Sequence, residues 1–222
     1  MTEPAPAATV VLLRETAGAL EVLLVRRNPE LAFHGGAWVF PGGRVDPEDV
    51  LQDGEEAAAR RTAVREAREE AGLDIDPAGL VALSHWTTPE GRPRRFATWF
   101  FLGRAGTGTV AVDGGEIHDH AWWTPGAALA EQAAGRIELP PPTFVTLTAL
   151  RAHASLTEAL DAARAREPQV FVPRPVAIDG GMCALYPGDA GWESGDPARP
   201  GARHRLLLLA GGWRYVAGGT GD

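Results

Sequence analysis

The first quarter of the chain is patterned as β-structure followed by loop. Residues 8–14 (ATVVLLR) and 20–27 (LEVLLVRR) are two β-like runs, and the intervening ETAGA has the composition of a turn. Together they predict a β-hairpin. Residues 28–54 are dense in Gly and Pro, which predicts loop with one short strand around Trp38 to Phe40.

A helix is predicted from Glu55 to Ala71, because this stretch is rich in alanine and contains neither Gly nor Pro. Gly72 follows directly and is expected to form the C-cap. At the start of the helix, Asp53 and Glu56 have the spacing of a capping box.

The rest of the chain mixes both kinds of element. Further β-like runs occupy 79–86, 95–104 and, more weakly, 116–123, whereas helical patterns lie near 143–153 and 155–166. From Gln169 onward the pattern changes to short β-like pieces at 174–186 and 203–216, joined by a long polar loop. This order predicts α+β, or a layered sheet with helices on both sides.

The segment RHRLLLLAGGWRYV (203–216) alternates poorly and is rich in Leu, which is typical of a strand buried on both faces. Three roles are open for this C-terminal part: it extends the sheet, closes over a substrate cleft, or forms a dimer seam.

Composition narrows the class of protein. A chain of 222 residues with 45% hydrophobic and 23% charged residues can bury a real core, as soluble globular proteins do. No apolar run approaches the roughly 20 residues that span a bilayer, and the N-terminus lacks a secretory pattern. The single cysteine, Cys183, is expected to be a buried apolar residue. We therefore expect a cytoplasmic protein that does not bind membranes.

Charge excludes further mechanisms. The net charge of −8 argues against binding to a nucleic acid polymer, which requires clustered cations. All 21 basic residues are arginine, so lysine-based phosphate binding and Schiff-base chemistry are excluded. Any phosphate contact must come from arginine, backbone N–H groups or a metal ion.

Three glutamates crowd the end of the predicted helix. Glu66, Glu69 and Glu70 share one face, since they are spaced i, i+3, i+4, and the Glu66–Glu70 pair costs a few tenths of a kcal/mol in an isolated helix. Arg65, four residues before Glu69, offsets part of that repulsion. Either this is a solvated face, or carboxylate oxygens bind Mg²⁺ or Mn²⁺ there.

The segment FPGGRVD, with Gly42 and Gly43 in a tight turn, precedes the helix, and together they resemble the Nudix box, G-x5-E-x7-R-E-U-x-E-E-x-G-U. The second half matches at Arg65, Glu66, Glu69, Glu70, Gly72 and Leu73, with Ala67 at the apolar position. The first half departs: Arg65 lies 22 positions after Gly43, where the pattern has 14. The family's earlier glutamate aligns with Ala57, so Glu55 or Glu56 is the candidate replacement.

A second resemblance is to the peroxisomal coenzyme A diphosphatase branch of this family and its bacterial relatives. Its upstream signature, L-L-T-x-R-[SA]-x3-R-x3-G-x3-F-P-G-G, fits residues 23–43. The matching positions are Leu23, Leu24, Arg27, Gly36, Phe40, Pro41, Gly42 and Gly43. Val25, Asn28 and Ala32 replace the Thr, Ser/Ala and Arg of the signature.

These resemblances imply a fold and a reaction. The fold class is α/β (α+β): a Nudix α/β/α sandwich with a mixed sheet, in residues 8–154. Residues 1–7 are expected to be a flexible N-terminus, and residues 155–222 a helix plus a β-rich extension. The reaction is metal-dependent hydrolysis of a diphosphate linkage.

Residue roles are carried over position by position. The implied Mg²⁺ or Mn²⁺ ligands are Glu66, Glu69, Glu70 and a carbonyl at Gly42. Arg65 orients the glutamates, and Arg27 and Gly43 contact substrate. The general base is either Glu66, through a bridging water, or Glu116; the alternative for Glu116 is an ordinary surface residue.

Several other candidate site residues have two interpretations each. Arg92, Arg94 and Arg95 at a strand entrance are phosphate ligands or a basic turn. His118 and His120 ligate a metal or are edge-strand residues, and His34 is a signature histidine or an exposed loop residue. Trp38, Trp122 and Trp123 stack on a nucleobase or lie in the core.

Three functions remain open from the sequence. The first is a diphosphatase acting on coenzyme A or acyl-coenzyme A. The second is a housecleaning Nudix enzyme acting on nucleotide sugars, dinucleotides or oxidised nucleotides. The third is a non-catalytic nucleotide sensor, which the intact glutamate face argues against. A homodimer is an open alternative to a monomer, because Nudix enzymes are frequently dimers.

Overall fold

The computed structural model describes residues 3–31, 34–46, 48, 54–106, 108–112 and 114–220. The strands of its first sheet are β1 (Ala5–Thr16), β2 (Ala19–Arg27), β3 (Trp38–Val39), β4 (Gly42–Arg44), β5 (Val81–Thr87), β6 (Phe96–Arg104), β7 (Ile117–Trp123) and β8 (Gln169–Phe171). The second sheet comprises β9 (Arg174–Ile178), β10 (Gly181–Leu185), β11 (Ala202–Leu209) and β12 (Gly212–Thr220). The helices are α2 (Glu55–Ala71), η1 (Pro77–Gly79), α3 (Pro125–Ala133), α4 (Pro141–Leu150) and α5 (Leu156–Arg164).

The first sheet is mixed, as the sequence predicted. Its order is β3-β2-β1-β6-β5-β8, with β4 paired to β1 and β7 paired to β2. β1 runs parallel to β6, and β5 runs parallel to β8, whereas the other pairs are antiparallel. The predicted hairpin 8–27 is confirmed as β1–β2. β1 begins at Ala5, so residues 5–7, expected to be flexible, are part of the sheet.

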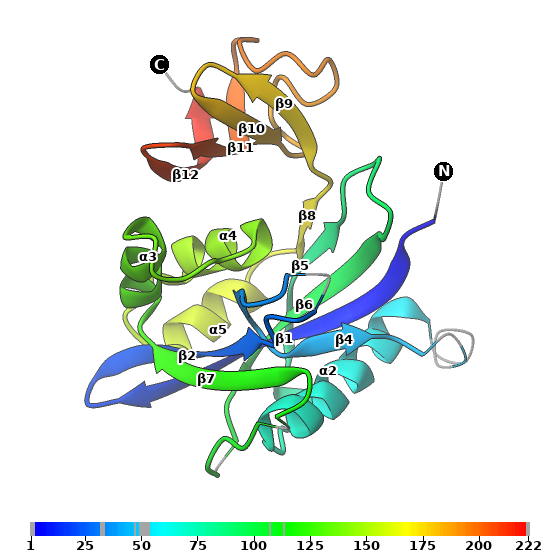
Figure 1. The fold of residues 1–222 in the computed structure, drawn as a ribbon, viewed down its shortest axis with the longest axis vertical. Helices are drawn as coiled ribbons and strands as arrows, with labels where there is room; N and C mark the ends of the chain where they lie inside the picture. The colour runs from blue at the N-terminus through cyan, green and yellow to red at the C-terminus, as the bar shows by residue number, and fades with distance from the viewer. Residues whose placement is uncertain are drawn as a thin grey trace.

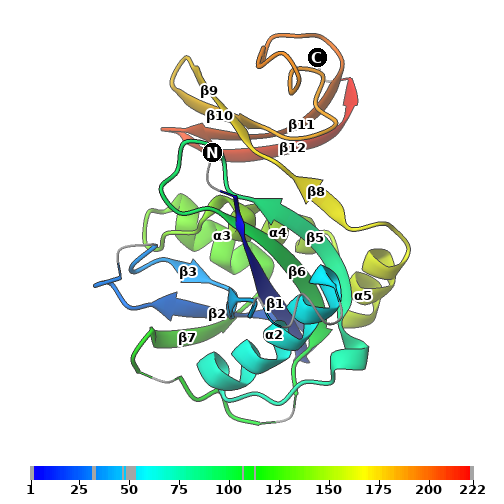
Figure 2. The same cartoon turned by 90° about the vertical axis from the view of Figure 1, so that its right-hand side faces the viewer.

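Helices cover both faces of this sheet (Figures 1 and 2). Along β1, Val10 and Leu12 face α2, whereas Val11 and Leu13 face the core shared with α3, α4 and α5. A strand buried on both faces reads as a continuous apolar run, which explains the sequence VVLL. The α/β/α sandwich is therefore confirmed.

The bounds of α2 agree with the prediction. Gly72 closes the helix in the left-handed conformation, with φ 67°. At the N-terminal end of α2, the predicted capping box is wrong. Asp53 lies outside the described residues, the N-cap is Gly54, and Glu56 forms an ion pair with Arg60 at 2.9 Å instead.

Helix α3 was missed by the sequence analysis. It is only nine residues long and contains Gly126, so its propensity is weak. The available signal was its start, where the Thr124 hydroxyl accepts a hydrogen bond from the N–H of Ala127 and Pro125 occupies the first turn.

The C-terminal part forms its own antiparallel sheet, ordered β12-β11-β10-β9. In the described part of the chain after residue 168, β8 is the strand that joins the first sheet, so of the three open roles for 203–216, extension of that sheet is excluded. Figures 1 and 2 show the second sheet at one end of the molecule, above α3 and α4. Phe171 of β8 stacks on Trp86 with ring centroids 3.8 Å apart, and Trp213 packs edge-on against Phe144 of α4.

The predicted burial of both strand faces holds for only part of β11: His204, Arg205 and Leu206 are buried, whereas Leu207 to Leu209 are half-buried. Leu206 faces the first core, and Arg205 forms a buried ion pair with Asp189 at 2.6 Å. Cys183 is fully buried, as expected. None of the helices in the described ranges is long and apolar enough to span a membrane.

Candidate active site

Two of the three helix glutamates are buried against the strand that precedes the helix. Glu66 and Glu70 are 8% and 6% exposed, whereas Glu69 is exposed. The carboxylate of Glu70 accepts a 2.9 Å hydrogen bond from the N–H of Gly42. The carboxylate of Glu66 lies against Gly43, so the glutamate face of α2 meets β4.

The two glycines were expected in a tight turn, and this is wrong, since they lie in strand β4, paired to Thr9 and Ala8 of β1. Their lack of a side chain is required for another reason. A Cβ on Gly42 would lie 2.4 Å from the carbonyl oxygen of Ala8, and one on Gly43 would lie 2.2 Å from Glu66 Oε1. Glycine therefore permits close approach to both the sheet and the glutamate.

Arg65 connects the glutamates to β4. Its guanidinium pairs with Glu66 at 2.8 Å and with Glu69 at 2.6 Å, and it donates to the carbonyl of Arg44 at 3.1 Å. One planar fork thus satisfies three acceptors on two elements, which a lysine could not do with the same geometry. The predicted orienting role for Arg65 agrees with these contacts.

The electrostatics of this face are unfavourable for negative charge. Burial raises the pKa of Glu70 to about 8; the Gly42 N–H opposes the rise, and the charges of Glu66 and Glu116 add to it. Burial also raises the pKa of Glu66, against the influence of Arg65. Hard divalent cations prefer oxygen ligands, and two buried carboxylates need a positive charge to compensate them. This pair therefore fits a divalent cation.

The third carboxylate, Glu69, is exposed and ion-paired with Arg65. In the part of the chain that the structure describes, no three His, Cys, Asp or Glu side chains are arranged as a complete metal-ligand set. The role of Glu69 as a third metal ligand stays a prediction. Gly42 is brought to Glu70 through its N–H, and its carbonyl as a ligand stays a prediction.

Glu116 lies beside the same face. Its carboxylate pairs with Arg27 at 2.6 Å, although the two residues are 89 positions apart in sequence. The charges of Glu116 and Arg27 both influence Glu70, in opposite directions. The structure therefore brings together two predicted site residues at one end of the β2–β7 pair, where β2 ends and β7 begins.

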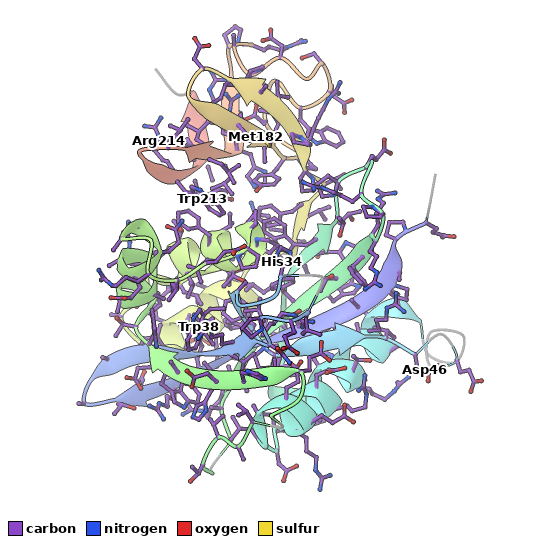
Figure 3. All side chains as sticks on the ribbon, viewed as in Figure 1. His34, Trp38, Asp46, Met182, Trp213 and Arg214 are labelled. Carbon is purple, nitrogen blue, oxygen red and sulfur yellow. The ribbon has the colours of Figure 1, made fainter. Side chains whose placement is uncertain are left out.

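The β5–β6 loop holds the remaining predicted substrate residues. Arg95 donates to the carbonyl of Thr88 at 3.2 Å, and Arg94 is exposed in the same loop. The charge of Arg92 reaches His34, whose backbone is left-handed at φ 53° and whose pKa is lowered chiefly by burial. His34, labelled in Figure 3, belongs to the segment between β2 and β3. Phosphate binding by Arg94 and Arg95 stays a prediction.

The structure places the aromatic and histidine candidates in different environments. Trp38 is buried and packs on Trp123 with centroids 5.6 Å apart, so the core reading is confirmed for it. Trp122 carries the Arg14 guanidinium 4.1 Å above its ring. His118 is exposed on β7, and metal binding there gains no support from the described residues.

One residue near this site was missed. Asn28 hydrogen-bonds the loop that carries Glu116, through its side chain at 3.0 Å and its backbone N–H at 2.8 Å. The only sequence signal was that Asn28 departs from the coenzyme A signature.

Comparison with known proteins identifies the family. The family model described as NUDIX domain matches residues 3–141. The NUDIX hydrolase of Alicyclobacillus acidocaldarius superposes with a TM-score of 0.65 at 26% identity, covering 72% of this chain and 97% of that one.

Two curated relatives are named as coenzyme A enzymes. Peroxisomal coenzyme A diphosphatase ndx-8 of Caenorhabditis elegans is 42% identical over 34% of this chain and 30% of its own. Acyl-coenzyme A diphosphatase NUDT19 of Xenopus laevis is 36% identical over 36% of this chain and 22% of its own. The matches thus span less than a third of either relative. With the domain match covering more than half of the sequence, the chain belongs to the NUDIX family.

Proposed function

We propose that this protein is a divalent-metal-dependent hydrolase of a diphosphate linkage. The observation that carries the proposal is the pair of buried carboxylates, Glu66 and Glu70, which lie against β4, where Arg65 pairs with Glu66 and the N–H of Gly42 donates to Glu70. Burying two like charges a few residues apart is costly, and it is explained by a cation between them.

Glu66, Glu70 and, after rotation, Glu69 hold the cation, together with the carbonyl of Gly42. A bound Mg²⁺ or Mn²⁺ supplies charge neutralisation for phosphate oxygens and lowers the pKa of a water molecule. Arg65 keeps Glu66 and Glu69 oriented. Gly43 leaves room for the Glu66 carboxylate, as a side chain at that position would occupy the same space.

Glu116 is the general base, and Arg27 binds a substrate phosphate. Both are supported by position, because their ion pair lies where the charge of Glu116 reaches Glu66 and Glu70. Arg94 and Arg95 are further phosphate ligands from the β5–β6 loop. Because the chain contains no lysine, the guanidinium groups of these arginines supply the cationic contacts to phosphate.

The leading substrate is coenzyme A or an acyl derivative. This is supported by the signature in residues 23–43 and by two relatives that carry coenzyme A diphosphatase names. A housecleaning role on another nucleoside diphosphate derivative is the second candidate. It is favoured by the three departures, Val25, Asn28 and Ala32, from that signature.

The test is a hydrolysis screen with Mg²⁺ and with Mn²⁺ over coenzyme A, acyl-coenzyme A, ADP-ribose, NADH and nucleoside triphosphates. The Glu69→Gln, Glu70→Gln double variant is the control. Cleavage of coenzyme A to 3′,5′-ADP by the wild type alone supports the first candidate. Turnover of other nucleotides only supports the second, and absence of turnover with both metals refutes the proposal.

A further inference from the structure

Asn28 ties the end of β2 to the loop before β7. Its side-chain amide donates to the carbonyl of Gly115 at 3.0 Å, and its backbone N–H donates to the carbonyl of Glu116 at 2.8 Å. Its side-chain oxygen accepts from the N–H of Glu30 at 3.0 Å, which fixes the rotamer of the amide. All three partners are backbone groups.

The loop needs this support because the β2–β7 ladder becomes irregular there. Pairing is regular from Val22 with Trp123 to Arg26 with Asp119, and then shifts so that Arg27 pairs with Ile117. Beyond that shift the regular ladder ends, and the Asn28 bonds take its place. The backbone of Glu116 is thereby fixed relative to β2.

The side chain of Glu116 is held separately. Arg27, whose side chain is mostly buried, binds the carboxylate at 2.6 Å. If Arg27 also binds a substrate phosphate, the phosphate competes with Glu116 for the same guanidinium. The Asn28 bonds involve backbone carbonyls that a phosphate does not displace, so they persist when substrate is bound.

We propose that Asn28 is a positioning residue, which keeps Glu116 beside the glutamate face of α2 when Arg27 turns to the substrate. The proposal rests on the proposed function, in which Glu116 is the general base. It assigns a role to one of the three positions at which the chain departs from the coenzyme A signature. A purely local role, the Asx turn with Glu30, is the alternative.

Two variants separate these roles. In Asn28→Ser the hydroxyl can still accept from the N–H of Glu30, but it is too short to reach Gly115. Asn28→Ala removes both side-chain hydrogen bonds, the one to Gly115 and the one from Glu30. The backbone bond to Glu116 is kept in each variant. Asp196→Ala is the matched control, because it removes a similar side-chain cap, to the N–H of Ala198, in the C-terminal extension.

The experiment is a double-mutant cycle with Glu116→Gln, measuring kcat and KM on the substrate found in the screen. Both Asn28 variants are expected to lower kcat roughly ten- to hundred-fold with KM within about two-fold, since misplacing a catalytic group has costs of this order. In the Glu116→Gln background the same substitutions should change kcat by less than about two-fold. Asp196→Ala should leave both constants unchanged.

Equal losses of kcat in the two backgrounds would show that Asn28 acts on folding and not through Glu116, which overturns the proposal. Unchanged kcat in Asn28→Ser, with a loss only in Asn28→Ala, would assign the effect to the Asx turn and also overturn it. If Glu116→Gln is as active as the wild type, Glu116 is not the general base and this inference is refuted. The proposal of a metal-dependent hydrolase would not be affected by that result. No turnover by the wild type would refute both.

Discussion

The buried carboxylate of Glu70 makes the stability of the metal-free protein depend on pH in an unusual direction. Glu70 is 6% exposed and accepts a hydrogen bond from the N–H of Gly42. Glu70→Gln removes the charge but keeps the volume and an acceptor oxygen for that N–H. The variant therefore isolates the cost of ionising Glu70 from the cost of repacking.

The sign follows from the pKa of Glu70, which rises from 4.5 to about 8 on folding. Between these pH values the folded protein retains a proton that the unfolded chain has lost, so the free energy of unfolding falls as pH rises. The slope is about 1.4 kcal/mol per pH unit, which gives at most about 5 kcal/mol in total. From pH 6 to pH 8 the loss is about 2 to 3 kcal/mol, and it stops above the folded pKa.

The assay is urea unfolding at pH 6 and pH 8 with a chelator and then with Mg²⁺. In chelator, Glu70→Gln should gain stability relative to the wild type as pH rises, by about 2 kcal/mol across this range. Mg²⁺ should restore the free energy of unfolding of the wild type at pH 8 and have little effect on that of the variant, because a ligand stabilises only the form that binds it. Glu69→Gln, at an exposed position on the same helix, is the matched control and should lack this pH-dependent gain.

Parallel pH dependence of the wild type and Glu70→Gln in chelator would refute the reasoning, since it would mean that Glu70 ionises as easily in the folded protein as in the unfolded chain. Equal stabilisation of both by Mg²⁺ would locate the cation away from Glu70.

Three further predictions follow from the contacts. Gly43→Ala places a Cβ 2.2 Å from Glu66 Oε1, so the end of the Glu66 side chain must move. We expect the free energy of unfolding in urea to change by about 1 kcal/mol or less, and kcat/KM to fall at least ten-fold. Arg65→Lys keeps the charge but loses the fork that satisfies three acceptors, so kcat/KM should fall about ten-fold or more; unchanged kinetics would mean that charge alone suffices. Asp189→Asn breaks the buried pair with Arg205 and should lower the free energy of unfolding by about 3 to 5 kcal/mol, whereas a loss below about 1 kcal/mol would contradict the burial argument.

Local features of the sequence predicted local structure well. The bounds of α2 could be read from alanine content and from Gly72, because propensity and a left-handed C-cap act within one turn. The shared face of the glutamates followed from helical periodicity alone. The N-cap could not be fixed in the same way, since several polar residues precede the helix and spacing does not select Gly54 among them.

Features that depend on packing were harder to predict. A pair of glycines ordinarily indicates a turn, and nothing in the local sequence shows that Gly42 and Gly43 serve as clearance for Ala8 and Glu66. Helix α3 forms although its propensity is weak, because burial of residues such as Leu129 stabilises it. In both cases the deciding contact comes from another element.

The candidate site illustrates the same division. Its α2 glutamates and Arg65 lie within six residues, so a motif can describe them. Glu116 is different: its place beside Glu70 depends on the pairing of β2 with β7, on the shift in that pairing at Arg27, and on the Asn28 bonds beyond it. A shift of pairing by one residue would send Glu116 to the other face of the sheet. The residues that hold the proposed base in register are therefore not visible as a motif, and a departure from a family signature, as at Asn28, is where to look for them.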